Sequence, residues 1–222
     1  IGALVGPDTR VIDLQGRLAV PGFIDSHGHY MGLGESRMIL DLTEARTWDD
    51  IVAMVAEAVA TAEPGAWIQG RGWHQEKWDV VPVPNVDGVP THTGLSAVSP
   101  DHPVYLTHAS GHASVVNAKA LALAGIDAST ADPPGGTIVR DAAGNPSGLL
   151  RETAQRIVGR ALAHAQEGRS PEEAEARLRE AVRLAGEDAL SKGVTSFHDA
   201  GANFATIDFF KKLEAEGALP VR

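Results

Sequence analysis

Predicted strands and helices alternate along most of this chain, and this alternation restricts it to an α/β fold with a parallel sheet. The clearest unit begins at Ser170, where Ser-Pro-Glu-Glu has the spacing of a helix N-terminus with proline in the first turn. Apolar residues then recur at helical spacing up to Gly193, and residues 194–197 form an apolar run typical of a strand. Residues 204–217 repeat the helix pattern, and residues 219–222 begin what we expect to be one more strand.

The rest of the chain fits the same scheme. Strands are predicted at residues 23–26 (as a buried strand), 67–70 and 104–107, and helices at 47–62 and 115–124. Residues 74–102 show no clear period and are predicted to be a long loop that carries function. Residues 137–150 are predicted to form a β-hairpin around a Gly/Asn turn.

Several predicted strands end in polar segments that contain histidine. A (β/α)8 barrel of the TIM type presents its catalytic groups in this way, at the carboxyl ends of its strands. A full barrel takes about 250 residues, so only part of one fits here. We therefore expect a partial (β/α)8 barrel in residues 20–222, with an inserted loop and hairpin region at about 74–150. Residues 1–19 are expected to be a β segment with a hairpin turn at Gln15-Gly16.

The strongest candidate for chemistry is a pair of histidines, His27 and His29, directly after the strand predicted at 23–26. Alternate residues of an extended chain point to the same side, so both imidazoles can face one point. Two convergent imidazoles suit zinc or a similar divalent ion. Gly28 between them adds no bulk, and Asp25 before them is expected to be structural or to orient a ligand from outside.

Two further residues are candidate metal ligands, because a catalytic zinc takes about three protein ligands. Glu152 follows Leu149-Leu150 and can sit at a strand end that faces the site. Alternatively, it favours the N-terminus of a helix predicted at 152–163. His198 ends the strand at 194–197 and can lie near the metal, or it can pack within its loop and bond to the backbone.

Trp73 and His112 are candidate substrate-binding residues. His112 follows the third predicted strand and can contact a substrate carbonyl or leaving group; alternatively, His108 and His112 cap the next helix. Trp73 lies at the tip of the second strand, where it forms either a substrate wall or loop packing.

The stretch Pro21-Gly22-Phe23-Ile24-Asp25-Ser26-His27-Gly28-His29 resembles the first-strand motif of the amidohydrolase superfamily. Other segments match, in order along the chain, a branch of metal-dependent amidohydrolases similar to N-substituted formamide deformylase. They are Gly70-Arg71-Gly72-Trp73, Ser110-Gly111-His112-Ala113, Val116-Asn117, Asp132-Pro133-Pro134-Gly135-Gly136, Gly148-Leu149-Leu150-Arg151-Glu152 and Gly193-Val194-Thr195-Ser196-Phe197-His198-Asp199-Ala200-Gly201.

This resemblance implies hydrolysis of amide-type, non-peptide carbon–nitrogen bonds in small molecules. One or two divalent ions, with zinc expected, would activate the attacking water. It also implies that residues 1–19 belong to a small β-sandwich-like domain. The family's catalytic aspartate and further ligands lie in later segments that have no match here, so the catalytic residue is unknown. The chain then resembles the N-terminal half of an amidohydrolase. Its expected partner is the remainder of the same chain or a second copy.

Composition excludes several classes of function. The net charge of −10 argues against a nucleic-acid partner, which would require a surplus of Lys and Arg. The absence of cysteine excludes disulfides and thiolate metal sites. No apolar run approaches the ~20 residues that span a bilayer. The location is expected to be cytoplasmic, although the chain starts at Ile1 without Met and a signal peptide could precede it.

An alternative interpretation remains open at this point. The chain could be a non-catalytic fragment, or an α/β binding domain that lacks a complete metal site and whose histidines only pack.

Overall fold

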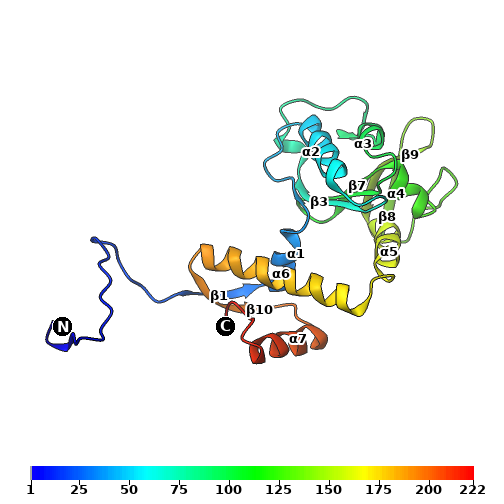
Figure 1. Cartoon of the computed structure of the whole chain (residues 1–222). Helices are drawn as coiled ribbons and strands as arrows, with labels where there is room; N and C mark the ends of the chain where they lie inside the picture. Colours follow the sequence, from blue (N-terminus) through cyan, green and yellow to red (C-terminus); the bar gives the residue numbers. More distant parts are fainter. Residues whose placement is uncertain (1) are drawn as a thin grey trace. The chain divides into compact units, whose positions relative to one another are not determined.

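The structure is a computed structural model that describes residues 2–222 and assigns the chain to two units (Figure 1). The first unit comprises the chain up to His29 together with Gly186–Arg222, and the second comprises Tyr30–Ala185. The second unit therefore interrupts the first, over a wider range than the inserted region of about 74–150 expected from the sequence. Helix α6 (Pro171–Ser191) contains residues of both units.

In the first unit, strands β1 (Phe23–Gly28) and β10 (Val194–Asp199) are parallel neighbours (Figure 1). Helix α7 (Phe204–Ala215) follows β10, as the sequence pattern predicts, and is capped by Asn203. Both strands lie close to their predicted positions. The βαβ alternation expected for an α/β fold is therefore present in this unit.

The last residue of the chain pairs with β10 in the manner of a further parallel strand. The Arg222 N–H donates to the Thr195 carbonyl at 3.0 Å, and the Arg222 carbonyl accepts from the Phe197 N–H at 2.7 Å. Bonds to the residues on either side of one partner, here Ser196, are the pattern of a parallel ladder. The strand start expected at 219–222 is thus supported at its final residue.

The expected burial of the first strand is wrong. Phe23 and Ile24 of β1 are 60% and 59% exposed. Within the described residues, β1 has β10 as its single partner strand, so too few side chains are available to cover its apolar face.

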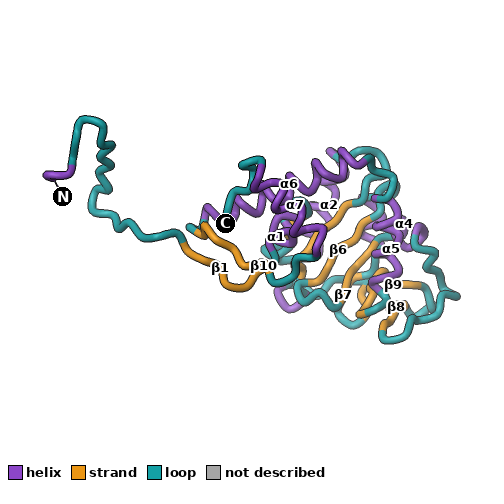
Figure 2. Tube along the Cα trace, turned by 90° about the horizontal axis from the view of Figure 1, so that it is seen from below, coloured by secondary structure: helices purple, strands orange, loops and turns teal. Residues whose placement is uncertain are grey.

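The N-terminal segment forms the predicted turn but not the predicted strands. Gln15 and Gly16 both have positive φ, 50° and 78°, and the Arg17 N–H donates to the Leu14 carbonyl. Between a short 3-10 helix, η1 (Gly2–Leu4), and β1, the chain is loop (Figure 2). An isolated two-stranded hairpin is marginal in water, and the apolar side chains here are exposed, Val11 by 71% for example.

The second unit contains a six-stranded sheet in the order β2-β3-β6-β7-β9-β8. Its strands are β2 (Leu40–Asp41), β3 (Ile68–Trp73), β6 (Val104–His108), β7 (Ala113–Val116), β8 (Gly136–Arg140) and β9 (Pro146–Glu152). Its helices are α1 (Tyr30–Ser36), α2 (Trp48–Thr61), α3 (Thr93–Val98), α4 (Ala118–Leu123) and α5 (Gln155–Gln166).

This sheet is mixed, so the expectation of a purely parallel sheet needs correction. Strands β2, β3 and β6 are parallel, whereas β7, β9 and β8 join by antiparallel pairing. The strands predicted at 67–70 and 104–107 exist, and the hairpin at 137–150 is confirmed as β8–β9. However, β3 and β6 lie in a different sheet from β1 and so do not follow it as barrel strands. An apolar run predicts a strand without specifying its partner.

Two local predictions also need correction. The helix predicted at 115–124 begins only at Ala118, because Val115 and Val116 belong to β7 and Asn117 caps α4. The region 74–102 is not structureless. It holds a 3-10 turn η2 (Gln75–Lys77), the small hairpin β4 (Asn85–Val86) and β5 (Val89–Pro90), and α3. These elements are too short to produce a detectable period.

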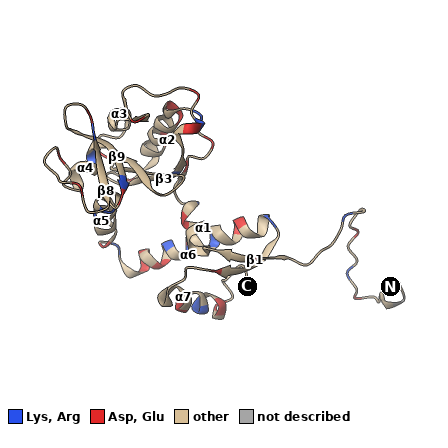
Figure 3. Ribbon diagram, turned by 180° about the vertical axis from the view of Figure 1, so that it is seen from behind, with Lys and Arg blue, Asp and Glu red and all other residues tan. Residues whose placement is uncertain are grey.

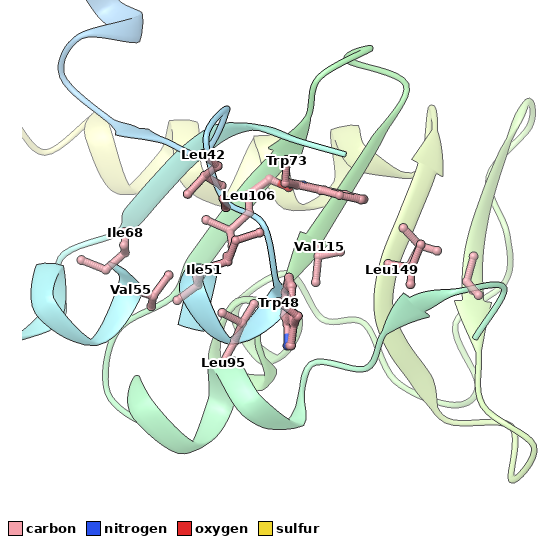
Figure 4. Close-up of a cluster of buried hydrophobic side chains, with 14 residues drawn as sticks. Leu42, Trp48, Ile51, Val55, Ile68, Trp73, Leu95, Leu106, Val115 and Leu149 are labelled. Carbon is pink, nitrogen blue, oxygen red and sulfur yellow. The ribbon is translucent and has the colours of Figure 1, made fainter. Parts of the chain in front are cut away.

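Helices cover both faces of the six-stranded sheet, which gives this unit three layers. Val115 and Leu149 point into a cluster with α2 and α3 (Figure 4), whereas Val116 and Leu150 point into a cluster with α4 and α5. Successive strand residues face opposite sides of a sheet, so these neighbouring pairs supply both cores. The sheet is therefore a rigid base for the loops at its strand ends.

Helix α6 carries acidic and basic side chains together (Figure 3). Its N-terminus forms the predicted capping box, in which Ser170 Oγ accepts from the Glu173 N–H and Glu173 Oε2 accepts from the Ser170 N–H. Intrahelical ion pairs such as Arg179–Glu175 at 2.7 Å follow.

Within residues 2–222, no helix is both long enough and apolar enough to cross a membrane.

Gly34 allows α1 to touch α6 closely, and its replacement by alanine is expected to destabilise the second unit. A Cβ on Gly34 would lie 1.9 Å from the carbonyl oxygen of Ala181. Because the blocking atom is backbone, the helices must separate, at a cost near or above the top of the ~1–3 kcal/mol range for overpacking. Urea denaturation measures this loss.

Gly159→Ala in α5 is the matched control, since nothing lies within 4 Å of its added Cβ. It should instead stabilise by about 0.5–1 kcal/mol. Equal effects of the two substitutions would show that the α1–α6 contact is not as close as described.

Candidate functional site

The two histidines predicted to bind metal lie at the end of β1. His27 is in the strand and His29 follows Gly28, and their ring centroids are 6.0 Å apart with an interplanar angle of 74°. Both residues are exposed, and no described residue forms a hydrogen bond with either ring. Asp25 Oδ1 accepts from the His27 N–H at 3.0 Å, which agrees with the expected structural role of Asp25. Both rings therefore retain nitrogens for another ligand.

Two glycines make room for this pair. A Cβ on Gly28 would lie 2.3 Å from the ring of Phe197, and a Cβ on Gly201 would lie 2.7 Å from Nδ1 of His29. The Ala200 N–H donates to the Gly28 carbonyl at 2.8 Å, so the segment after β10 runs along the end of β1. Both glycines belong to the segments whose residues resemble the amidohydrolase motifs.

The other candidate ligand in this unit, His198, lies in β10 with an exposed side chain. Its neighbour Asp199 accepts from the Gly201 N–H at 2.8 Å and pairs with Gly28 across the ladder. Within residues 2–222, no three His, Asp or Glu side chains are grouped closely enough to hold a metal ion. His27 and His29 thus fit a divalent ion as two donors of a larger set, and ligation by His198 stays a prediction.

Glu152 lies in the second unit, at the end of β9. Its φ of 51° is left-handed, a conformation that is costly for a residue with a side chain. Its Oε2 lies 3.0 Å from Nδ1 of His112, and its N–H donates to the His112 carbonyl at 2.9 Å. Helix α5 begins at Gln155, so the alternative that Glu152 sits in the first turn of a helix is wrong.

His112 belongs to a loop that is held by a chain of side chains. Ser110 Oγ accepts from the His112 N–H at 3.2 Å and contacts Nδ1 of His108 at 2.8 Å. Nε2 of His108 contacts Gln75 Oε1 at 3.1 Å, so both ring nitrogens of His108 are engaged. Burial lowers the pKa of His108, and the nearby rings of His74 and His112 lower it further. His108 is therefore a neutral, structural histidine rather than a helix cap.

Trp73 is a core residue. It is 1% exposed, donates from Nε1 to the Leu106 carbonyl at 2.9 Å, and stacks on Trp78 with ring centroids 5.9 Å apart. It also lines a cavity of about 350 Å³ together with His112 and Glu152. Sequence analysis found these two residues but missed Gln75 and Ser110, and the Ser-Gly-His motif was the available signal for Ser110.

Gly201→Ala is expected to displace His29 and so to weaken metal binding in the whole protein. The added Cβ would meet Nδ1 of His29 at 2.7 Å, and the ring must turn away. Disturbing a group that orients a ligand typically lowers metal affinity by about 10–100-fold. Metal content after dialysis against a competing chelator measures the effect.

Gly168→Ala, where nothing lies within 4 Å of the added Cβ, should bind metal as the parent does. Unchanged metal affinity in Gly201→Ala would argue against His29 as a ligand.

Comparison with known proteins decides to which family the chain belongs. The model of an amidohydrolase family matches residues 10–222. This chain belongs to the amidohydrolase family. The putative amidohydrolase YtcJ of Bacillus subtilis is 33% identical over 97% of the chain, and N-substituted formamide deformylase of Arthrobacter pascens is 31% identical over 96%. The chain covers 39% and 38% of these two proteins, or about two fifths of their length.

Solved structures show the same fold relationship for this amidohydrolase chain. Uncharacterised metal-dependent hydrolases from Pyrococcus horikoshii OT3 and Pyrococcus furiosus match 91% of the chain with TM-scores of 0.60 and 0.57. Their sequence identities are 23% and 24%, and the chain covers 35% and 36% of them. The family match confirms the resemblance seen in the sequence, and the alternative of a non-catalytic α/β binding domain is not favoured.

Proposed function

We propose that this chain is part of a metal-dependent hydrolase that cleaves amide-type carbon–nitrogen bonds. The observation that carries the proposal is the exposed pair His27 and His29 at the end of β1, inside the matched family region. Two imidazoles without other hydrogen-bond partners among the described residues are suitable donors for a divalent ion. Zinc is the ion we propose, as one or two ions.

Residues of this chain have distinct roles in the proposed site. A bound divalent ion would lower the pKa of water and polarise a carbonyl group. His27 and His29 would hold it, and Asp25 fixes the backbone of His27 through its N–H. Gly201 leaves space for the ring of His29. His198 is proposed as a neighbour of the site on β10.

The setting of the site is also a proposal. We propose that β1, β10 and the segment at Arg222 are consecutive strands of a (β/α)8 barrel, because they pair in chain order and in parallel. The missing strands would come from the remainder of the same chain or from a second copy. The substrate would be a small-molecule amide, with no nucleic acid or membrane involved, and the location would be the cytoplasm.

The test is a metal-dependence assay on the whole protein. The purified protein is treated with a chelator, supplied again with zinc, and assayed against a panel of N-alkyl formamides and acetamides and their ester analogues. We expect turnover of at least one amide to be lost with the metal and restored by zinc. Turnover that persists unchanged without metal, or turnover of esters alone, would contradict the proposal.

A further inference from the structure

One of the cavities in the second unit is lined by His112, to which the proposed hydrolysis assigns no role. This cavity of about 350 Å³ has apolar walls from residues such as Val89, Ala113 and Leu149, and His112 and Glu152 lie at its polar side. A concave site with apolar walls and a few fixed polar groups is the usual form of a small-molecule site.

The contact with Glu152 determines which nitrogen of His112 can accept a hydrogen bond. An ionised carboxylate only accepts hydrogen bonds, so Nδ1 of His112, 3.0 Å from Glu152 Oε2, carries the proton. In a neutral imidazole, Nε2 is then the acceptor. Among the described residues, none forms a hydrogen bond with Nε2 of His112.

Several contacts hold this arrangement in place. The Glu152 N–H donates to the His112 carbonyl at 2.9 Å, and Gln155 Nε2 donates to the Gly111 carbonyl at 3.1 Å. Ser110 Oγ accepts from the His112 N–H. The loop and the end of β9 are therefore bound to each other at more than one point, which restricts rotation of the imidazole.

The stability of the fold does not explain this arrangement. The His112 and Glu152 side chains are 71% and 56% exposed, and at such exposure even a charged pair would contribute little to stability. The positive φ of Glu152 also has an energetic cost. Strained backbone that positions an exposed polar pair beside a cavity is typical of a binding site rather than of a structural contact.

Several other polar side chains of the cavity are already engaged. His108 and Ser110 bond to each other and to their neighbours, and Arg151 forms an ion pair with Asp87 at 3.0 Å. His112, whose Nε2 has no hydrogen-bond partner among the described residues, lines the same cavity as Val89, Ala113 and Leu149. A complementary ligand has an N–H donor attached to a small apolar body.

We propose that this cavity binds a small N–H-bearing molecule, a secondary amide or an amine, by donation of its N–H to Nε2 of His112. Glu152 is a positioning residue that keeps Nδ1 of His112 protonated. This binding occurs within the second unit and does not depend on the metal or on hydrolysis. Its test therefore measures binding and ring tautomer rather than turnover.

The experiment is an NMR titration of the whole protein, with ¹⁵N-labelled histidine, against three probes. N-butylacetamide has the N–H, N-butyl-N-methylacetamide lacks it, and butylamine presents an amine N–H. We expect N-butylacetamide or butylamine to shift Nε2 of His112 and to bind at least tenfold more tightly than the N-methylated amide. The probe that does so identifies the source of the N–H as amide or amine.

Variants separate positioning from packing. His112→Ala should remove the binding, and Glu152→Ala should weaken it at least tenfold and give His112 a mixture of tautomers. Glu152→Gln retains a carbonyl acceptor for Nδ1. It should therefore restore most of the ligand affinity and most of the tautomer that is protonated at Nδ1. Glu167→Ala is the matched control, because it breaks the His164–Glu167 pair, also 3.0 Å long, at the C-terminal end of α5 and outside the lining of this cavity.

Each of the following results would overturn the proposal. They are an affinity for the N-methylated amide equal to that for the tighter-binding of the two N–H probes, unchanged binding in His112→Ala, or a parent protein in which Nε2 rather than Nδ1 of His112 carries the proton. Absence of binding by all three probes would overturn it as well. The comparison of the two amides uses the unmodified protein, so it remains decisive if a variant fails to fold.

Discussion

Replacing His27 or His29 with asparagine is expected to remove bound metal from the whole protein and to lower amide hydrolysis by roughly a thousandfold or more, because metal-activated water is lost. The effect on stability should be small. Both side chains are exposed and form no hydrogen bond with another described residue through their rings, so the free energy of unfolding should change by less than about 0.5 kcal/mol. Metal analysis, turnover and urea denaturation of the same preparations provide the three measurements.

His164→Asn is the matched control for this prediction. His164 is an exposed histidine on α5 that contacts Glu167, and its loss should change neither metal content nor turnover. If His27→Asn and His29→Asn kept the metal content of the parent, both residues would be excluded as ligands.

Asn117→Asp is expected to be the most damaging polar substitution in the second unit. Asn117 is fully buried, and its Nδ2 donates to the carbonyls of Ser99 and His102 at 3.0 and 2.8 Å and to Ser99 Oγ at 2.9 Å. Aspartate cannot donate, so a carboxylate would face these oxygens. Each buried acceptor left without a donor costs about 1–3 kcal/mol, and we expect a loss of roughly 3–5 kcal/mol in total.

The other half of the Asn117 side chain explains why aspartate is an informative replacement. Oδ1 accepts from the N–H groups of Ala120 and Val104, at 2.9 and 3.0 Å, and so caps α4 and holds the start of β6. Aspartate keeps both of these bonds. Any loss of stability therefore comes from the missing donor and the buried carboxylate, and not from a lost helix cap.

Asn203→Asp provides the comparison. Asn203 caps α7 by accepting from the Thr206 N–H in an exposed position, and aspartate caps helices about as well as asparagine. Its effect should stay within about 0.5 kcal/mol. Similar losses for both substitutions, measured by urea denaturation, would contradict the structural role of the Asn117 donor.

Much of the secondary structure follows from local sequence signals. The capping boxes at Thr47 and Ser170 and the cap at Asn203 specify helix starts through bonds within three residues, so the sequence alone contains them. The apolar runs that became β1, β3, β6 and β10 were equally clear. The coarse α/β class, confirmed by the structure, depends on these signals.

The pairing of strands could not be predicted from such local signals. Sequence order suggested that β3 and β6 follow β1 in one sheet, whereas β1 pairs with β10, more than 160 positions later. Such pairing depends on which apolar faces meet across the molecule, and not on the pattern of either strand. For the same reason, the apolar residues Phe23 and Ile24 predicted a buried strand that is exposed in the described chain.

In the candidate sites, too, contacts between residues close in sequence were predictable, whereas contacts between distant residues were not. His27 and His29 are two positions apart, so their proximity was predictable from strand geometry. The contact between His112 and Glu152 joins residues 40 positions apart, and it depends on the pairing of β7 with β9. The sequence identified both residues but assigned them to separate functions, metal and substrate.

Anomalous X-ray diffraction from crystals of the whole protein, grown with zinc, tests whether His27 and His29 hold the metal. We expect an anomalous peak at the zinc edge with one nitrogen of His27 and one of His29 each at about 2.0–2.1 Å. The same data from His27→Asn/His29→Asn crystals should show no peak there. A zinc site elsewhere, with both imidazoles free of metal in the parent, would contradict the assignment of this pair as the metal-binding residues.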